Sequence, residues 1–194
     1  MKTLCVYCGS SPGTDPAYLE AGKALGRLLV ARDIGLVYGG ASVGVMGAVA
    51  DAVLAGGGRA IGIIPEALAV REVAHDGLTE QHVVGSMHER KALMADRSDG
   101  FVALPGGWGT FEEIFEVLTW AQLGFHEKPC GLLNVNGYYD HLHAFLEHAI
   151  ESGFVPPVCR DMLMVDEEPE RLLDRYTAYR APRVRKWITR EAET

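Results

Sequence analysis

The chain has 194 residues, 48% of them hydrophobic, and a formal net charge of −8. This charge argues against a nucleic-acid polymer as partner, because neutralising its phosphates would need clustered Lys and Arg. No apolar run approaches transmembrane length and no signal segment is recognisable, so we expect no membrane partner and a cytoplasmic protein. One folded domain over residues 1–180 is expected, followed by a charged tail over 181–194.

Short apolar runs alternate with longer segments of helical periodicity along the chain. The expected strands are Thr3–Cys8, Leu36–Tyr38, Ala60–Ile64, His82–Val84 (the weakest), Phe101–Leu104, Gly131–Leu133 and Leu163–Val165. The expected helices are Ala17–Arg32, Val45–Ala55, Met87–Arg97, Phe111–Leu123, Tyr138–Ser152 and Pro169–Tyr176. Strands that are apolar on both faces and separated by helices indicate a parallel sheet covered on both sides. The predicted fold is therefore α/β, a doubly wound, mostly parallel, Rossmann-like sheet in a single domain.

Small-residue turns follow several of these strands, at the edge where parallel α/β sheets bind ligands. They are the turns at 9–11 (Gly-Ser-Ser), 39–42 (Gly-Gly-Ala-Ser) and 105–107 (Pro-Gly-Gly). Three such turns at one edge predict a crevice of nucleotide size. The first turn is not a G-x-G-x-x-G fingerprint, and no acidic residue closes the second strand, so a redox role with NAD is disfavoured.

The basic segment 86–94 begins with the Ser-x-x-Glu spacing of a capping box. Helical periodicity places Met87, Arg90, Lys91 and Met94 on one face. Charges flanked by apolar residues are costly unless they are paired, so we favour a ligand-facing role over a solvated surface. Arg suits bidentate binding of phosphate or carboxylate, and Lys supplies a point charge.

The most informative segment is 105–113, which reads Pro-Gly-Gly-Trp-Gly-Thr-Phe-Glu-Glu between a strand and a helix. Its glycines allow close backbone approach, and a helix start presents unpaired N–H groups, so the turn suits an anion, most often a phosphate. A carboxylate beside a phosphate needs a reason. Glu113 either closes a capping box with Thr110 or has a chemical role, and both readings stay open at this point.

Neither the cysteines nor the histidines predict a metal site. Cys5 and Cys8 lie three apart on an expected strand and face opposite sides of it. Cys130 and Cys159 read as buried apolar residues. The two histidines in 140–143 are two apart on an expected helix and diverge, which favours a solvated helix face.

The segments 87–91 and 104–113 resemble the LONELY GUY family of cytokinin-activating phosphoribohydrolases. The similarity covers nearly the whole chain, including 7–11, 37–40, 44–47, 119–124, 128–129 and 134–139. Departures are slight: Trp108 stands where Tyr or Leu is more usual, and Glu66 is additional.

The resemblance implies hydrolysis of the N-glycosidic bond of an adenine-type nucleoside 5′-monophosphate, giving free base and ribose 5-phosphate. Its catalytic pair maps to Arg90 and Glu113. It also implies homodimers or larger assemblies, without metal or organic cofactor. With the sheet-edge turns added, the expected substrate-binding set is Gly9, Ser10, Gly39, Gly40, Glu72, Met87, Arg90, Lys91, Gly106, Gly107, Trp108, Gly109, Thr110, Glu112, Glu113 and Thr119.

The proposed chemistry also suits the residues themselves. Loss of the base leaves positive charge on the sugar, which a carboxylate stabilises and a carboxylate-activated water attacks. Arg90 either holds the phosphate or ribose, or keeps Glu113 ionised; the sequence leaves both open. It also leaves open whether the base is isoprenylated adenine or adenine.

Two alternatives belong to other classes. A non-catalytic nucleotide-binding or carrier module would use the same fold, but pure binding has no use for Glu113 near a phosphate. Amino-acid decarboxylation would need a cofactor such as pyridoxal phosphate on a lysine, and only Lys91 lies near the site. The helix at 111–123 carries the apolar stripe Phe111, Ile114, Phe115 and Leu118, which reads either as dimer surface or as core.

Overall fold

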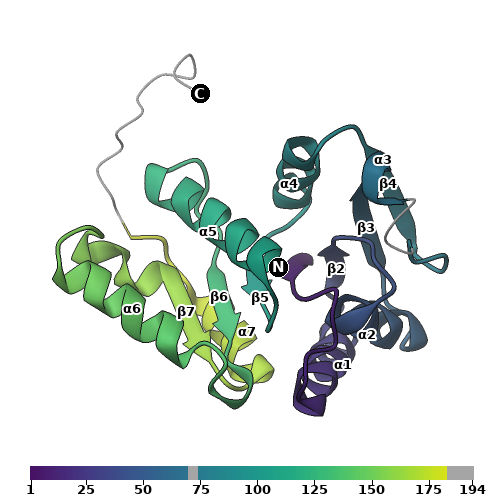
Figure 1. The fold of residues 1–194 in the computed structure, drawn as a ribbon, viewed down its shortest axis with the longest axis horizontal. Helices are drawn as coiled ribbons and strands as arrows, with labels where there is room; N and C mark the ends of the chain where they lie inside the picture. Colours follow the sequence, from purple (N-terminus) through teal and green to yellow (C-terminus); the bar gives the residue numbers. More distant parts are fainter. Residues whose placement is uncertain (70–73, 183–194) are drawn as a thin grey trace.

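The computed structural model describes residues 1–69 and 74–182 (Figure 1). Its strands are β1 (Thr3–Tyr7), β2 (Gly35–Tyr38), β3 (Ala60–Pro65), β4 (Glu80–Val84), β5 (Phe101–Ala103), β6 (Cys130–Leu133) and β7 (Leu163–Asp166). Its α-helices are α1 (Pro16–Ala31), α2 (Gly44–Ala55), α3 (Glu66–Ala69), α4 (Met87–Asp96), α5 (Trp108–Leu123), α6 (Asp140–Glu151) and α7 (Pro169–Ala178). Two 3₁₀ helices, η1 (Val135–Gly137) and η2 (Pro157–Met162), precede α6 and β7.

The seven strands form one sheet in the order β4-β3-β2-β1-β5-β6-β7, and every pairing is parallel. The chain builds outward from β1 to β4, then crosses to β5 on the other side of β1. This reversal leaves the carboxyl ends of β1 and β5 as the switch point where open α/β sheets bind ligands. The predicted doubly wound, Rossmann-like fold is confirmed.

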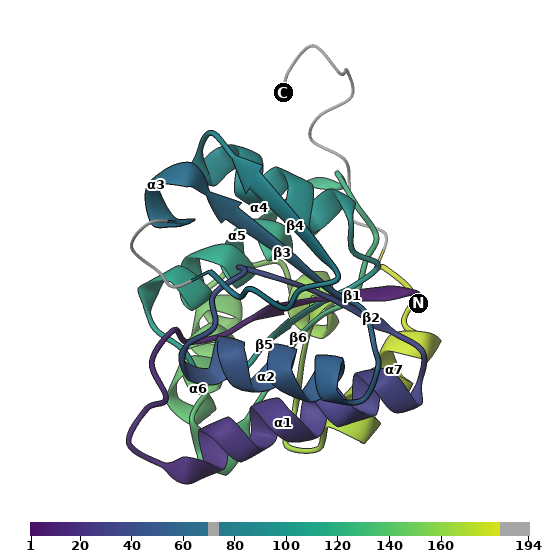
Figure 2. The same cartoon turned by 90° about the vertical axis from the view of Figure 1, so that its right-hand side faces the viewer.

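Helices cover both faces of the sheet (Figure 2). One core cluster joins the strands to α1, α2 and α7, and the other joins them to α4 and α5. Cys8 belongs to the first cluster and Cys5 to the second, so the two thiols face opposite sides as predicted. The structure has all four cysteines as free, buried thiols.

Several boundaries differ from those predicted. The weak fourth strand is real and two residues longer, because it pairs with β3 along five positions. The helix predicted from Tyr138, which is α6, begins at Asp140, since η1 and the left-handed Asn136 (φ 50°) bend the chain first. The short α3 was not predicted; four residues are too few for a periodic signal.

In the described ranges, none of the helices is both long enough and apolar enough to cross a bilayer. Most of the predicted tail at 181–194 lies outside the described residues, which end at Pro182.

Candidate active site

The start of α5 lies three residues earlier than predicted, and this changes how Glu113 is read. Gly107 is the N-cap, in an extended conformation and without a side-chain cap, so Trp108 is the first helical residue. Thr110 then lies inside the first turn, buried, with its side chain packed on Gly106. The Thr110–Glu113 capping box is therefore wrong, because Gly107 caps the helix with its backbone alone. Glu113 belongs to the second turn.

Two glycine turns meet at the switch point. The Gly9 N–H donates to the Pro105 carbonyl (3.1 Å), and the Gly9 carbonyl accepts from the first turn of α2. A cavity of about 300 Å³ opens between these turns. Its walls include Gly9, Ser10, Gly106, Gly107, Tyr18 and Tyr138. The backbone N–H groups of the first turn of α5 have no partner within that helix, which is the usual setting for a bound anion.

Arg90 and Glu113 lie together under this edge of the sheet. Their exposed fractions are 4% and 5%, and Nη2 of Arg90 is 3.5 Å from Oε1 of Glu113. Arg90 Nε has no hydrogen-bond partner among the described residues, although it is fully buried. A Cβ at Gly39 would collide with the guanidinium, so only glycine at the end of β2 leaves room for it. A buried cation with an unused donor is suited to receive a further anionic or polar group.

The ionisation of Glu113 is poised near neutrality. Burial raises the pKa of Glu113 to about 7, while the Arg90 charge acts in the opposite direction and lowers it. A carboxyl with this pKa exchanges its proton near neutral pH, as a general acid or base must.

Glu113 should also give the fold a distinctive pH dependence. Its pKa in the folded state exceeds the usual 4.5. The protonated Glu113 side chain therefore makes its full contribution to the free energy of unfolding below pH 4.5, and this contribution is lost as the pH rises to about 7. Between pH 5 and 8 the free energy of unfolding should fall by about 2–3 kcal/mol more than in Glu113→Gln, which has no proton to lose. Urea unfolding of both proteins measures this difference, and parallel pH profiles would contradict it.

Lys91 is buried but already paired. Its Nζ donates to Glu112 and, at 2.9 Å, to Glu116. Burial opposes the charged form, but these hydrogen bonds outweigh it and raise the pKa of Lys91. The ammonium therefore ties α4 to α5 and holds the helix that carries Glu113 against the helix that carries Arg90.

Comparison with known proteins identifies the family of this chain. The family model described as "Possible lysine decarboxylase" matches residues 46–176. A "probable cytokinin riboside 5'-monophosphate phosphoribohydrolase" of Oryza sativa subsp. japonica is 53% identical over 92% of this chain and 78% of its own length. A cytokinin riboside 5'-monophosphate phosphoribohydrolase of Arabidopsis thaliana is 47% identical over 98% of this chain and 89% of its own. The chain belongs to the LONELY GUY family.

Among solved structures, the molybdenum cofactor binding protein of Rippkaea orientalis resembles the chain with a TM-score of 0.69. The two are 22% identical, over 92% of this chain and 97% of that one. At this identity the likeness concerns the fold alone, which this chain and the molybdenum cofactor binding protein have in common.

The structure brings part of the set expected from the family to one place. Arg90 contacts both Glu113 and Gly39, and Gly9, Ser10, Gly106 and Gly107 line the cavity between the two glycine turns at the same edge of the sheet. Met87 is half exposed, with its sulfur 3.8 Å from Arg90 Nη1.

Other members of the expected set are exposed to solvent, pack elsewhere or lie outside the described residues. Trp108 is 90% exposed beside the glycine turn, and no atom lies near enough to crowd a Cβ at Gly109. Gly40 packs on β3, behind Gly39. Glu72 lies outside the described residues.

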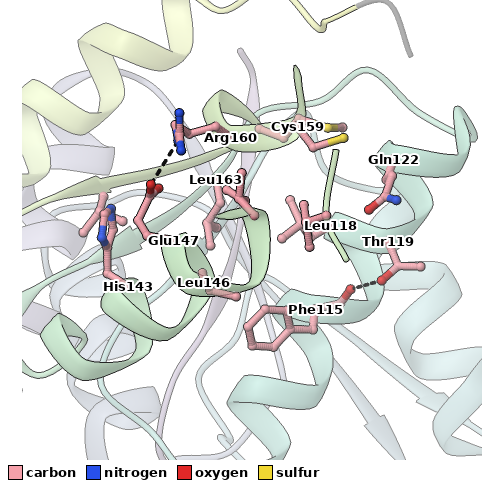
Figure 3. Close-up of a pocket in the computed structure, with 14 residues that line it drawn as sticks. Phe115, Leu118, Thr119, Gln122, His143, Leu146, Glu147, Cys159, Arg160 and Leu163 are labelled. Carbon is pink, nitrogen blue, oxygen red and sulfur yellow. Dashed lines mark hydrogen bonds and ion pairs between the residues drawn. The ribbon is translucent and has the colours of Figure 1, made fainter. Parts of the chain in front are cut away.

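Thr119 lies away from Glu113. It follows six residues later on α5, about 9 Å along the axis and about 120° around it. Its hydroxyl donates to the Phe115 carbonyl, and it lines a separate cavity of about 190 Å³ between α5 and α6 (Figure 3). Arg160 and Glu147 form an ion pair across this cavity's rim. One chain alone does not bring Thr119 to its own Arg90–Glu113 pair.

Sequence reasoning missed Glu116 as a partner of Lys91. Its position four residues after Glu112 places both carboxylates on one face of α5, which was a usable signal. His141 and His143 are exposed, as predicted for a solvated helix face. In residues 1–69 and 74–182, no group of three or more His, Cys, Asp or Glu residues could hold a metal ion.

Proposed function

We propose that the protein hydrolyses the N-glycosidic bond of adenine-type, cytokinin nucleoside 5′-monophosphates, releasing the free base and ribose 5-phosphate. The observation that carries this proposal is the buried Arg90–Glu113 pair, whose Glu113 lies on the helix that begins at the 105–107 turn. The named activity of relatives near 50% identity supports it.

The glycine turn is suited to the 5′-phosphate. Gly106, Gly107 and Ser10 line the cavity beside the start of α5, and none of the described residues in its wall is charged. A phosphate held there fixes the position of the sugar, so that binding energy is used to orient the glycosidic carbon for attack. From Gly107 to Glu113 is about 9 Å along α5, which leaves space for the sugar between phosphate and carboxylate.

Glu113 then acts on the sugar. As the base departs, positive charge develops on the ribose, and an ionised Glu113 stabilises it and accepts a proton from the attacking water. The water oxygen forms the new bond to the glycosidic carbon, and the base leaves with the bonding electron pair and takes up a proton. Arg90 lowers the pKa of Glu113 and so favours its ionised form, and its unused Nε offers a donor to the nucleotide.

The carrier reading has a weaker basis. This chain shares its fold with the molybdenum cofactor binding protein of Rippkaea orientalis, which makes a non-catalytic carrier conceivable. A carrier, however, needs no buried carboxylate with a pKa near neutrality, such as that of Glu113. Decarboxylation is disfavoured because Lys91 is held by two carboxylates and is not free to anchor an aldehyde cofactor.

Activity should depend on the 5′-monophosphate. Removing the phosphate removes the group that the turn binds, so kcat/KM for N6-isopentenyladenosine should lie at least about 100-fold below that for its 5′-monophosphate. Chromatography of the free base over matched time courses measures both values. If kcat/KM for the nucleoside were comparable to that for the 5′-monophosphate, the assignment of the 105–107 turn as the phosphate site would be wrong.

We infer that the working form is a homodimer. Thr119 belongs to the family's nucleotide-binding positions, yet it faces away from its own chain's Glu113, so a second copy is the natural source of this contact. The face around it also carries the partly exposed Phe115 and Leu118, which a partner chain would cover.

The dimer has a direct test. Light scattering at micromolar concentration should give about twice the mass of 21.1 kDa. A Thr119→Arg variant should shift the mass toward the monomer and lose activity together, because bulk and charge at the contact oppose pairing. An active monomer would contradict the inference.

We also infer that residues 1–180 act as one domain and that the protein works in the cytoplasm. One continuous sheet and two shared cores support the first inference. Four free cysteines suit a reducing compartment and support the second.

A further inference from the structure

Two consecutive tyrosines contact the backbone of the glycine turn. The Tyr139 hydroxyl donates to the Leu104 carbonyl at 2.6 Å, and the Tyr138 hydroxyl donates to the Gly106 carbonyl at 2.5 Å. The carbonyl between them, of Pro105, accepts the Gly9 N–H at 3.1 Å. Three successive carbonyls, those of residues 104–106, are thus each held by a separate donor.

The tyrosines are themselves fixed in place. Asn134, buried at the end of β6, accepts the Tyr139 N–H at 2.7 Å and donates to Asp140 at 2.7 Å. The two tyrosine rings meet edge to face at 4.9 Å, and Tyr18 lies edge-on to Tyr138 at 5.6 Å. The donors therefore come from a preorganised segment, not from freely rotating side chains.

Fixing a carbonyl fixes the next N–H. The peptide unit is planar and trans, so the Gly107 N–H points opposite to the Gly106 carbonyl. Glycine offers no side chain to restrict the turn, and its backbone would otherwise sample several orientations. The hydrogen bond from Tyr138 therefore selects one direction for the Gly107 N–H, at the helix start where the anion is expected.

We propose that Tyr138 is a positioning residue that orients the Gly107 N–H for the 5′-phosphate, with Tyr139 anchoring the strand end behind it. This inference rests on the proposed function in placing the phosphate at the turn. It adds Tyr138 to the residues that serve the phosphate site, although Tyr138 lies 32 positions from Gly106 and acts through the Gly106 carbonyl.

The test measures binding of ribose 5-phosphate by calorimetry and hydrolysis of N6-isopentenyladenosine 5′-monophosphate. Tyr138→Phe keeps the ring and removes only the hydroxyl. We expect the Kd for ribose 5-phosphate and the KM for the nucleotide to rise about 3- to 10-fold, the value of one hydrogen bond, with a smaller change in kcat. A merely structural loss would lower Tm without this separation of KM from kcat.

Tyr176→Phe is the matched control. The Tyr176 hydroxyl also donates to a backbone carbonyl, that of Phe101 at 2.6 Å, but at the start of β5 and away from the glycine turn. It should lower Tm and leave the Kd for ribose 5-phosphate unchanged. The inference is overturned if Tyr138→Phe keeps the wild-type Kd, or if Tyr176→Phe raises it equally. Because binding is measured without turnover, a wild type that binds ribose 5-phosphate but releases no base would refute the proposed function and leave this inference standing.

Discussion

Glu113→Gln should lower kcat for N6-isopentenyladenosine 5′-monophosphate by about 100-fold or more. The amide has the size of the acid but carries no negative charge and accepts no proton from water. Nucleotide affinity should persist or increase, since a charge that repels the phosphate is removed. The variant should fold well, because Gln resembles the protonated carboxyl that burial already favours.

Single-turnover kinetics together with calorimetric binding separate these two effects. Glu116→Gln is the control. Glu116 lies three residues after Glu113 on the same helix, and its carboxylate pairs with Lys91. The kcat of this variant should stay within about tenfold of the wild type, as expected for a partly exposed ion pair. Wild-type turnover in Glu113→Gln would return Glu113 to a structural role.

Arg90→Ala should lower kcat/KM by about 100-fold or more and raise KM. The variant loses a donor to the ligand and also the positive charge that favours ionised Glu113. If the ionised carboxylate is the active form, kcat/KM of the wild type rises with pH through about 7. In Arg90→Ala this acidic limb should move to higher pH.

Arg90→Lys distinguishes the two roles of the arginine. It keeps the positive charge but lacks the planar set of donors, so its acidic limb should stay near that of the wild type while KM rises. The pH profiles of kcat/KM for the three proteins measure this. An unshifted limb in Arg90→Ala would show that Arg90 does not control the ionisation of Glu113.

Much of this site could be predicted from the sequence because the relevant signals are periodic. Alternation of apolar strands and helices predicts the parallel sheet, and its carboxyl edge brings the turns of β1 and β5 together. Helical spacing predicts that Arg90 and Lys91 face inward, and both are buried. Each inference needs only the periodicity of single elements and the general rule that parallel sheets bind ligands at their carboxyl edge.

Contacts between elements were harder to predict. The spacing of Glu112 and Glu116 places both carboxylates on one face of α5, but whether that face meets Lys91 depends on how α4 and α5 pack. The prediction of a capping box was wrong for a different reason. Thr110 and Glu113 have the correct spacing, but Gly107 is the N-cap, so the helix begins before Thr110. Likewise, the tyrosine contacts join the segment between η1 and α6 to residues 104 and 106 across more than 30 positions.

The most direct test of the proposed activity is a product analysis after incubating the purified protein with N6-isopentenyladenosine 5′-monophosphate. Chromatography with mass detection should find free isopentenyladenine and ribose 5-phosphate in equal amounts, over many turnovers and without added metal or organic cofactor. Glu113→Gln should give almost none of either. Stoichiometric binding of intact nucleotide with no release of base by the wild type would contradict the hydrolase and favour the carrier.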